Sequence, residues 1–384
     1  MKSKETLIST DQAKIWLTEF ACPLWLDKGI DWKNGGFYEC LSLQGEPTPS
    51  PRRVMVQARQ IFSSHLAMNL GIISGEQCRA SIKKGIDFIL RYYSLPSGGF
   101  LHAIDENFEP LKKPEDLYGQ AFALFGLAHS FKVLSDTFYK NRAKQLLAYL
   151  NRERKLPQGG FSEILSQEIQ YEANPHMHLF EALLYWMEID SDPEWKIMAD
   201  EILSLCLNKF IDSEKTLLAE HFDSKWKPIL TNGIFIFEPG HHYEWVWLLG
   251  RYQKLTGKEL RPLRKKLYDV SEQYGISPTK KCAYDEVSSH LLPHKKTARF
   301  WPQCERIKAA LQLGLETEDR APYARTADES LHALFQFLDV PIQGLWYDTW
   351  QESGEFTIQP AKASSFYHII GAMSEYIQFR NLLG

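Results

Sequence analysis

The sequence predicts an all-α protein that folds as an (α/α)6 barrel, a toroid of twelve helices with long loops and short strands at one end. Three observations support this prediction. Apolar residues recur at i, i+3 and i+4 spacing through twelve segments, which is the period of an amphipathic helix. The segments between these helices alternate between long and short. A Gly-Gly-Phe motif returns in the long segments about every 60 residues, which is typical of a repeat architecture.

The predicted helices each combine an apolar face with recognisable ends. In the segment 193–210, the side chains of Ile202, Leu205 and Cys206 lie on one face. Short turns, such as the one at 135–136, supply N-cap residues between two helices. We expect helices over 11–27, 54–71, 77–93, 116–134, 136–151, 175–190, 193–210, 241–256, 259–274, 301–315, 322–338 and 363–382.

The long connectors precede every second helix. Three of them contain Gly35-Gly36-Phe37, Gly98-Gly99-Phe100 or Gly159-Gly160-Phe161. Gly-Gly followed by an aromatic residue suits a tight turn that leads into a short strand. Weaker forms of the motif occur at 221–226 and 344–348. Each repeat therefore consists of a helix, a long connector, a second helix and a short turn.

Six such repeats form either an open solenoid or a closed double ring of inner and outer helices. The closed ring is favoured, because neither end of the chain looks like the polar capping repeat that an open solenoid requires. The last helix, 363–382, is apolar with few charges, which suits an inner position. No Pro/Ser-rich linker divides the chain, so we expect residues 1–384 to form a single domain.

A closed ring places the chemistry at one end. All long connectors emerge there, and the second helix of each pair begins there, so the first turns of these helices line one pocket. Helix N-termini also direct their partial positive charge into it, which favours anionic intermediates.

Composition and charge exclude several classes of protein. The chain is 44% hydrophobic and 24% charged, with a net charge of −4, which argues against nucleic acids or anionic membranes as partners. No apolar run approaches the roughly 20 residues of a membrane span, and residues 1–6 lead into no apolar signal core. Six scattered cysteines without a C-x-x-C motif indicate free thiols. We expect a cytoplasmic monomer or homodimer.

The segment 238–245 contains the most distinctive candidate site residues. A Pro-Gly breaker leads into a helix that opens with His241 and carries Glu244 three residues later, so both lie on one helix face. A carboxylate beside an imidazole fixes its orientation and raises its basicity, as a general base requires. We expect both residues to be catalytic; a buried structural histidine is the alternative. His242 points about 100° away and suits a structural role.

The segment 174–181 repeats this arrangement. His178 and Glu181 have the same i, i+3 relation, and His176 lies before or at the helix cap. We expect all three to bind substrate, with His176 the weaker candidate. A satisfied core histidine is again the alternative for each imidazole.

Two further polar residues interrupt apolar helices. Arg59 lies in the segment 54–62, where an unpaired cation would be costly to bury. It either forms a salt bridge in the core or faces the pocket as a donor to an oxyanion. His368 is a lone histidine in an apolar helix, and its position in the repeat favours a functional role over a core role.

Aromatic and hydrogen-bonding residues occupy the same rim in two other repeats. They are Trp301 with Glu305, and Tyr118 with Gln120. Aromatic faces stack on the C–H faces of sugars, although aromatic residues at helical spacing often belong to the core. We expect these four residues to bind substrate.

A metal site is the competing interpretation of the His/Glu pairs, since imidazole and carboxylate bind zinc or manganese. However, His176 and His178 diverge on a helix, as do His241 and His242, and the chain has no H-E-x-x-H motif. It also has no Walker A, G-x-G-x-x-G or G-x-S-x-G motif. We therefore expect no metal and no cofactor.

Taken together, these motifs resemble the N-acylglucosamine 2-epimerase superfamily, which also contains cellobiose 2-epimerases, mannose isomerases and sulfoquinovose isomerases. The resemblance covers nearly the whole chain and is closest to bacterial D-mannose isomerase-type members. It implies the same (α/α)6 barrel. The segments that carry it are 55–59, 116–122, 176–181, 238–245, 299–305 and 365–368.

The resemblance also implies roles for individual residues. His241 and His368 would be the acid/base pair, with Glu244 orienting His241, while His178 and Arg59 would bind the substrate and its oxygen charge. The implied reaction interconverts D-mannose, or a close aldose, and D-fructose through a cis-enediolate without a metal. The substrate would be a monosaccharide.

Three alternatives remain open at this point. The same two histidines would allow 2-epimerisation of an N-acylglucosamine or N-acylmannosamine, or of cellobiose or mannose. An (α/α)6 glycoside hydrolase would need two facing carboxylates, for which Glu238, Asp285 and Asp348 are the loop candidates. A helical-repeat scaffold would instead bind protein partners on an exposed concave face.

Overall fold

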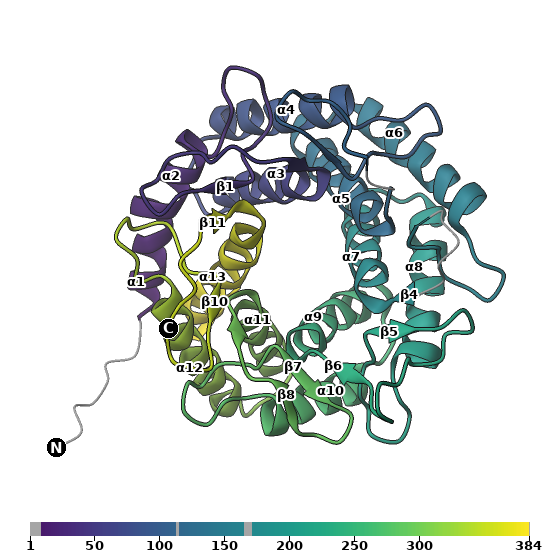
Figure 1. The fold of residues 1–384 in the computed structure, drawn as a ribbon, viewed down its shortest axis with the longest axis vertical. Coiled ribbons are helices and arrows are strands. Elements are labelled where there is room, and N and C mark those ends of the chain that lie inside the picture. The colour runs from purple at the N-terminus through teal and green to yellow at the C-terminus, as the bar shows by residue number, and fades with distance from the viewer. Residues whose placement is uncertain (1–8, 113–114, 165–170, 384) are drawn as a thin grey trace.

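The helices form two concentric rings in the computed structural model, which describes residues 9–112, 115–164 and 171–383 (Figure 1). The inner ring consists of α3 (Val54–Asn69), α5 (Leu117–Leu134), α7 (Ala173–Ile189), α9 (Pro239–Thr256), α11 (Trp301–Leu315) and α13 (Ala363–Leu383). The outer ring consists of α1 (Thr10–Ile15), α2 (Cys22–Asp27), α4 (Gly75–Tyr92), α6 (Thr137–Tyr149), α8 (Pro193–Leu205), α10 (Arg261–Tyr274) and α12 (Ala321–Phe337). The π-helical segment Trp16–Ala21 joins α1 to α2, and Leu150–Arg154 and Cys206–Phe210 extend α6 and α8.

The helix boundaries agree with those expected from the hydrophobic period. The segment expected over 301–315 is α11, and the one expected over 11–27 is helical from Thr10 to Asp27. Inner helices such as α5 are buried along most of their length, because they pack against other helices on nearly all sides. Within the described ranges, no helix combines the length and apolarity needed to cross a membrane.

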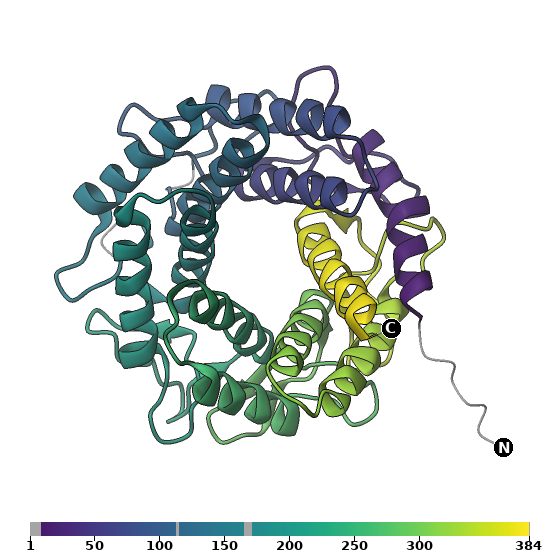
Figure 2. The ribbon, with the colours of Figure 1, turned by 180° about the vertical axis from the view of Figure 1, so that it is seen from behind.

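The inner ring is closed by its last helix. α13 packs against α11 and also against α3, and every other inner helix likewise packs against the inner helices before and after it. The closed toroid is therefore confirmed over the open solenoid. Figure 2 shows the ring from behind, at the end opposite the long connectors.

Short antiparallel strands link the long connectors at the other end (Figure 1). The pairs are β2 (Arg52–Arg53) with β3 (Ala103–Ile104), β4 (Tyr171–Glu172) with β5 (His221–Phe222), β6 (Ile236–Phe237) with β7 (Glu286–Ser288), β7 with β8 (Pro293–Lys295), β9 (Ala298–Arg299) with β10 (Thr349–Trp350), and β11 (Ala361–Lys362) with β1 (Cys40–Leu41). An isolated bridge between Asp116 and Ile164 supplies a further link. The connectors thus form a rim where the inner helices begin, as predicted.

A buried side chain in the first turn of an inner helix holds the preceding connector in place. The Gln57 side-chain oxygen accepts a hydrogen bond from the backbone N–H of Phe37 at 2.7 Å, and its amide donates to the Phe37 carbonyl at 2.9 Å. Buried backbone groups require such partners. Connector N–H groups make the same contact with four other side chains, in the pairs Gln120–Phe100, His176–Phe161, His242–Leu218 and Gln303–Ala283. We call these five side chains the anchor residues.

The anchor Gln57 explains the second glycine of the first connector motif. Gly36 has a φ of 75°, and a Cβ there would lie 2.5 Å from the Phe88 ring and 2.8 Å from the side-chain oxygen of Gln57. Such a Cβ would displace the anchor from the backbone it holds. Glycine is therefore required both for the left-handed conformation and for the close approach.

Gln120 and His176 hold connectors, which differs from the direct substrate contact expected from the sequence. Both side chains are fully buried. The Gln120 amide binds the N–H and carbonyl of Phe100, and the two ring nitrogens of His176 bind the Phe161 N–H at 3.0 Å and the Glu172 carbonyl at 2.9 Å. Because the backbone occupies these groups, they are not free to contact a sugar. The structural role expected for His242 agrees with its contact to the connector.

Candidate active site

Polar side chains one turn inside the inner helices meet in the interior of the ring. Arg59, His178, Glu244 and Glu305 each follow an anchor residue by two positions, and His368 occupies the corresponding turn of α13. All five are more than nine-tenths buried. The ring therefore collects residues from distant parts of the chain in one site, as the alternation of connector lengths predicts.

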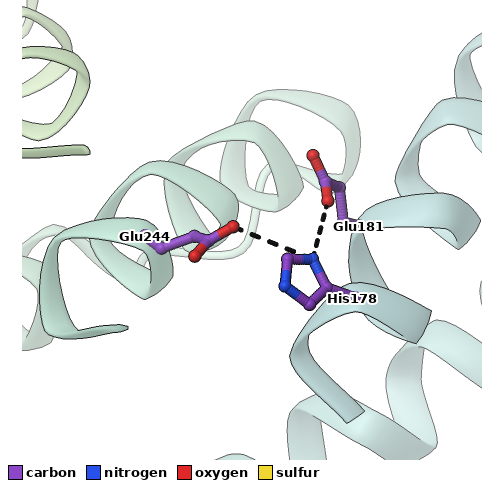
Figure 3. A group of neighbouring side chains, drawn as sticks. All are labelled: His178, Glu181 and Glu244. Atoms are coloured by element: carbon purple, nitrogen blue, oxygen red, sulfur yellow. Dashed lines mark hydrogen bonds and ion pairs between the residues drawn. The ribbon is translucent and has the colours of Figure 1, made fainter. Parts of the chain in front are cut away.

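His178 and Glu181 lie one turn apart on α7, and Glu244 faces them from α9 (Figure 3). Nδ1 of His178 is 3.1 Å from Oε2 of Glu181, so the contact expected from the i, i+3 spacing is present. Oε1 of Glu244 is 3.8 Å from the same nitrogen and has no hydrogen-bond partner among the described residues. Because an unpartnered buried carboxylate oxygen is costly, Glu244 is suited to bind a ligand.

His241 is oriented by Glu220, which corrects the expectation that Glu244 orients it. Nδ1 of His241 lies 2.7 Å from Oε2 of Glu220 and 3.9 Å from Oε2 of Glu238. Both carboxylates come from the connector before α9 or from its N-cap. Glu244 lies instead beside His178, because its neighbours are set by the facing helix α7 and not by its own helix.

His368 is held by Glu305 across the interface between α13 and α11. Its Nδ1 is 2.8 Å from Oε1 of Glu305. The other oxygen of that carboxylate accepts a hydrogen bond from Lys308 at 2.7 Å. Glu305 therefore bridges a histidine and a buried lysine, which differs from the direct substrate contact expected from the sequence.

Trp301 and Tyr118 complete the aromatic lining. The Trp301 ring centroid is 5.1 Å from that of His241 and 5.5 Å from that of His368, so one indole contacts both imidazoles. The Tyr118 hydroxyl accepts a hydrogen bond from Arg59 at 3.0 Å, and its ring packs edge-on against His178 at 5.1 Å. Both aromatic residues lie at the site, as the sequence predicts.

The two candidate acid/base histidines carry different charges at neutral pH. Burial lowers the pKa of His368 to about 3, so this imidazole is neutral. Burial also acts to lower the pKa of His241, but the carboxylates of Glu220 and Glu238 raise it to about 9. His241 is therefore an imidazolium. The structure thus distinguishes a candidate base from a candidate acid, which the sequence alone leaves undecided.

The carboxylates of the site also differ in charge. Burial acts to raise the pKa of Glu305, but Lys308 and His368 lower it to about 2. Burial, together with Glu305 and Glu181, raises the pKa of Glu244 well above its ordinary range. Glu305 is thus ionised, whereas the pKa of Glu244 is shifted toward the protonated form.

Two overlapping groups of side chains offer the donor atoms of a metal site. They are His178, Glu181 and Glu244, and Glu244, Glu305 and His368, with donor atoms within 4.8 Å of one another in each group. Such donors suit zinc or manganese. However, the Lys308 ammonium already contacts Glu305 and supplies a positive charge inside the second group. These groups combine side chains from different helices, whereas His176 and His178, and likewise His241 and His242, share one helix.

Carboxylates of the connectors are paired with cations. Arg299 contacts Asp285 at 3.0 Å and also Glu238, and Lys362 contacts Asp348 at 2.8 Å. A glycosidase needs two carboxylates that face one scissile bond. These three carboxylates instead serve ion pairs at the rim, so the arrangement does not favour hydrolysis.

Three residues of the site are absent from the sequence-based candidates: Glu220, Lys308 and Tyr367. Glu220 lies in a connector, where no periodicity relates it to His241. Lys308 follows Glu305 by three residues, the spacing that pairs His178 with Glu181, so that signal could have identified it. Tyr367 donates a hydrogen bond to Glu181 from the opposite side of the ring, a contact that closure alone creates.

Comparisons with known proteins agree with this architecture. The model of the N-acylglucosamine 2-epimerase family matches residues 36–372. A protein of Rhizobium meliloti (strain 1021) named mannose-6-phosphate isomerase is 36% identical over 367 residues, covering 94% of each chain. The crystal structure of a D-mannose isomerase matches with a TM-score of 0.86 at 19% identity, covering 96% of this chain and 98% of that one. Cellobiose 2-epimerase from Bacillus thermoamylovorans B4167 matches with a TM-score of 0.85 at 18% identity, with the same coverage. These two structures establish the shared fold.

Proposed function

The chain belongs to the N-acylglucosamine 2-epimerase family, and we propose that it interconverts D-mannose, or a close aldose, and D-fructose through a cis-enediolate. The family makes it a sugar isomerase or 2-epimerase. The finer proposal is supported by two oriented imidazoles: His241 and His368 are each held at Nδ1 by a buried glutamate, and each contacts Trp301. Proton transfer between adjacent carbons requires such groups.

His368 acts as the base in this proposal. Because its Nδ1 donates to the ionised Glu305, its lone pair lies on Nε2. Nε2 removes the C2 proton of the open-chain aldose. The electron pair of the broken C–H bond forms the C1–C2 double bond, and the carbonyl electrons move to O1, which gives the enediolate.

His241 and Arg59 stabilise the charge on the enediolate oxygens. The imidazolium of His241 donates a proton to the developing oxyanion. Arg59 is buried beside Tyr118, and the described residues include no carboxylate in an ion pair with its guanidinium. An unpaired guanidinium in a buried site is suited to bind an anionic oxygen.

The position at which the proton returns decides the product. When His368 delivers its proton to C1 and the neutral His241 takes the O2 proton as the C2 carbonyl forms, the product is the ketose. When the His241 imidazolium instead protonates the enediolate at C2 from the opposite face and the C1 carbonyl re-forms, the product is the 2-epimer. We favour isomerisation because the relative that shares 36% of its residues over nearly the whole chain is named as an isomerase. The 2-epimerisation of an N-acylated hexosamine or of cellobiose remains the alternative.

A phosphorylated aldose is the second candidate substrate, since that relative is named mannose-6-phosphate isomerase. The charges at the rim favour an unphosphorylated sugar instead. Arg299 and Lys362 contact carboxylates, and Arg53 likewise contacts Glu39. A phosphate at the rim would have to compete with these carboxylates for each cation.

We further propose that the reaction needs no metal or cofactor and takes place in the cytoplasm. The positive charges that stabilise the intermediate come from His241 and Arg59, while Lys308 balances the carboxylate of Glu305 behind His368. All six cysteines lack disulfide partners, which agrees with a reducing compartment.

Proton NMR in D₂O tests this proposal directly. The purified protein is incubated in parallel with D-mannose, D-mannose 6-phosphate, N-acetyl-D-mannosamine and cellobiose. We expect D-fructose from D-mannose, with solvent deuterium at C1 wherever the base exchanges its proton. Glucose deuterated at C2 would instead identify a 2-epimerase. If only D-mannose 6-phosphate is turned over, the substrate is the phosphorylated sugar and not free D-mannose.

A further inference from the structure

We propose that Lys308 is a positioning residue for His368: its ammonium holds the Glu305 carboxylate behind the imidazole and balances the charge of the buried glutamates around it. This inference rests on the proposed histidine-mediated reaction and extends it to a residue that contacts no reacting atom.

The contacts connect Lys308 to the base through a single carboxylate. Lys308 Nζ lies 2.7 Å from Oε2 of Glu305, and His368 Nδ1 lies 2.8 Å from Oε1 of the same residue. Lys308 is only 4% exposed, and its ammonium lies 3.8 Å from the centroid of the Trp247 ring. Burying a lysine is costly unless it is paired, so this arrangement indicates a function beyond packing.

The charge of Lys308 determines which nitrogen of His368 is basic. With Glu305 ionised, Nδ1 of His368 must donate the proton, and Nε2 is free to act as a base. Without the ammonium, burial would drive Glu305 to take up a proton. A protonated Glu305 could donate to Nδ1 instead, and the imidazole would then carry its proton on Nε2. The histidine would be present but in the wrong tautomer.

Lys308 also supplies the positive charge for a carboxylate cluster. Glu181, Glu244 and Glu305 all contribute to raising the pKa of Lys308, against the effect of burial. Glu244 has a carboxylate oxygen without a partner in the described structure. A single ammonium therefore takes the place that a cation from solution would otherwise fill.

A cavity that Lys308 lines opens near the ends of α3 and α13. The cavity measures about 140 Å³ and reaches from Lys308 to the exposed side chains of Asn69 and Gln378 near the ends of α3 and α13. Gly371 also lines it, and a Cβ at Gly371 would meet no atom within 4 Å. The cavity therefore gives small amines a route to position 308 from the end of the ring opposite the connectors.

The first test compares Lys308→Met with the exposed control Lys265→Met, which removes an ammonium paired with Asp269 on the surface. We expect kcat of Lys308→Met to fall about 100-fold, the scale of general-base catalysis, with little change in KM. Lys265→Met should match the wild type. Unchanged kcat in Lys308→Met would overturn the proposal.

A second readout does not depend on turnover. Nitrogen-15 NMR of the histidine rings should place the proton of His368 on Nδ1 in the wild type and on Nε2 in Lys308→Met. If Lys308→Met does not fold, Lys308→Gln keeps a donor toward Glu305 without the charge and is used for the same measurement. An unchanged tautomer in the folded variant would refute the role of Lys308, whereas a wild type without sugar turnover would refute the proposed function and leave the tautomer prediction standing.

Chemical rescue with small amines tests two points: whether position 308 needs a positive charge, and whether small molecules reach it through the cavity. Ethylammonium should restore at least a tenth of the lost rate to Lys308→Ala, whereas uncharged ethanol should not. Adding Gly371→Leu, which narrows the cavity, should weaken this rescue and leave the otherwise wild-type enzyme active. Equal rescue by ethanol would mean that position 308 needs only its volume filled, and would contradict the proposal.

Discussion

Nδ1 of His241 lies 2.7 Å from a carboxylate oxygen of Glu220, a residue 21 positions earlier in the chain. The other oxygen of Glu220 accepts the backbone N–H of Glu238, the N-cap residue of α9, at 3.0 Å. One buried connector carboxylate therefore fixes the start of an inner helix and the charge of the histidine that the helix presents. A connector therefore supplies a side chain to the candidate site as well as a segment of the rim.

Glu220→Gln should shift the pH dependence of the rate. The active form of His241 is protonated, so the wild-type rate should fall as the pH rises through about 9. Without the carboxylate, burial lowers the pKa of His241, and the decline should begin about two units lower. A pH profile of kcat/KM measures this shift, with the exposed Glu214→Gln as the control. A basic limb that stays near pH 9 would show that Glu220 does not set this pKa.

Replacement of His241 by alanine should reduce the rate, whereas replacement of its neighbour His242 should reduce the stability. His241→Ala should reduce kcat by at least about 1000-fold, because it removes the acid of the pair, and should change the melting temperature little. His242→Ala should leave the Leu218 N–H buried without its partner and reduce the free energy of unfolding by about 1–3 kcal/mol. Initial rates and thermal melts of both variants separate the two effects. Comparable losses of activity in well-folded samples would contradict the division of roles.

Arg59→Met should weaken stabilisation of the intermediate. The guanidinium contacts the Ser364 carbonyl and the Tyr118 hydroxyl, and Nε has no partner in the described structure. Loss of one donor to an oxyanion costs about 100-fold or more in kcat. Steady-state kinetics should show this loss mainly in kcat, with Arg53→Met at the rim as the control. A change confined to KM would mean that Arg59 binds the ground state and intermediate equally.

Chelation should leave the rate unchanged. Dialysis against EDTA followed by the mannose assay measures this, because the proposed mechanism draws its positive charge from protein side chains. The Lys308 ammonium lies 2.7 Å from Glu305 within the carboxylate cluster and opposes the binding of a second cation there. A loss of activity that manganese or zinc restores would assign the Glu244, Glu305 and His368 group to a metal.

Local patterns account for the parts of the site that the sequence predicted well. The helix expected over 363–382 is α13 (Ala363–Leu383), because hydrophobic period and breakers act within one segment. The contact between His178 and Glu181 follows from i, i+3 spacing in the same way. The i, i+3 spacing predicted the wrong partner for Glu244. This residue shares a helix with His241 but contacts His178 from the facing helix. Spacing also could not distinguish Gln120, which holds a connector, from a side chain that faces the site.

The sequence by itself determined the helices and their order, because these depend on local periodicity and on a repeat of nearly constant length. Only the tertiary structure decided which carboxylate serves which histidine. Glu220 pairs with His241, and Glu305 pairs with His368 from 63 residues away. These pairs, and the opposite charges they give the two imidazoles, depend on burial and on distances between helices that exist only once the ring has closed.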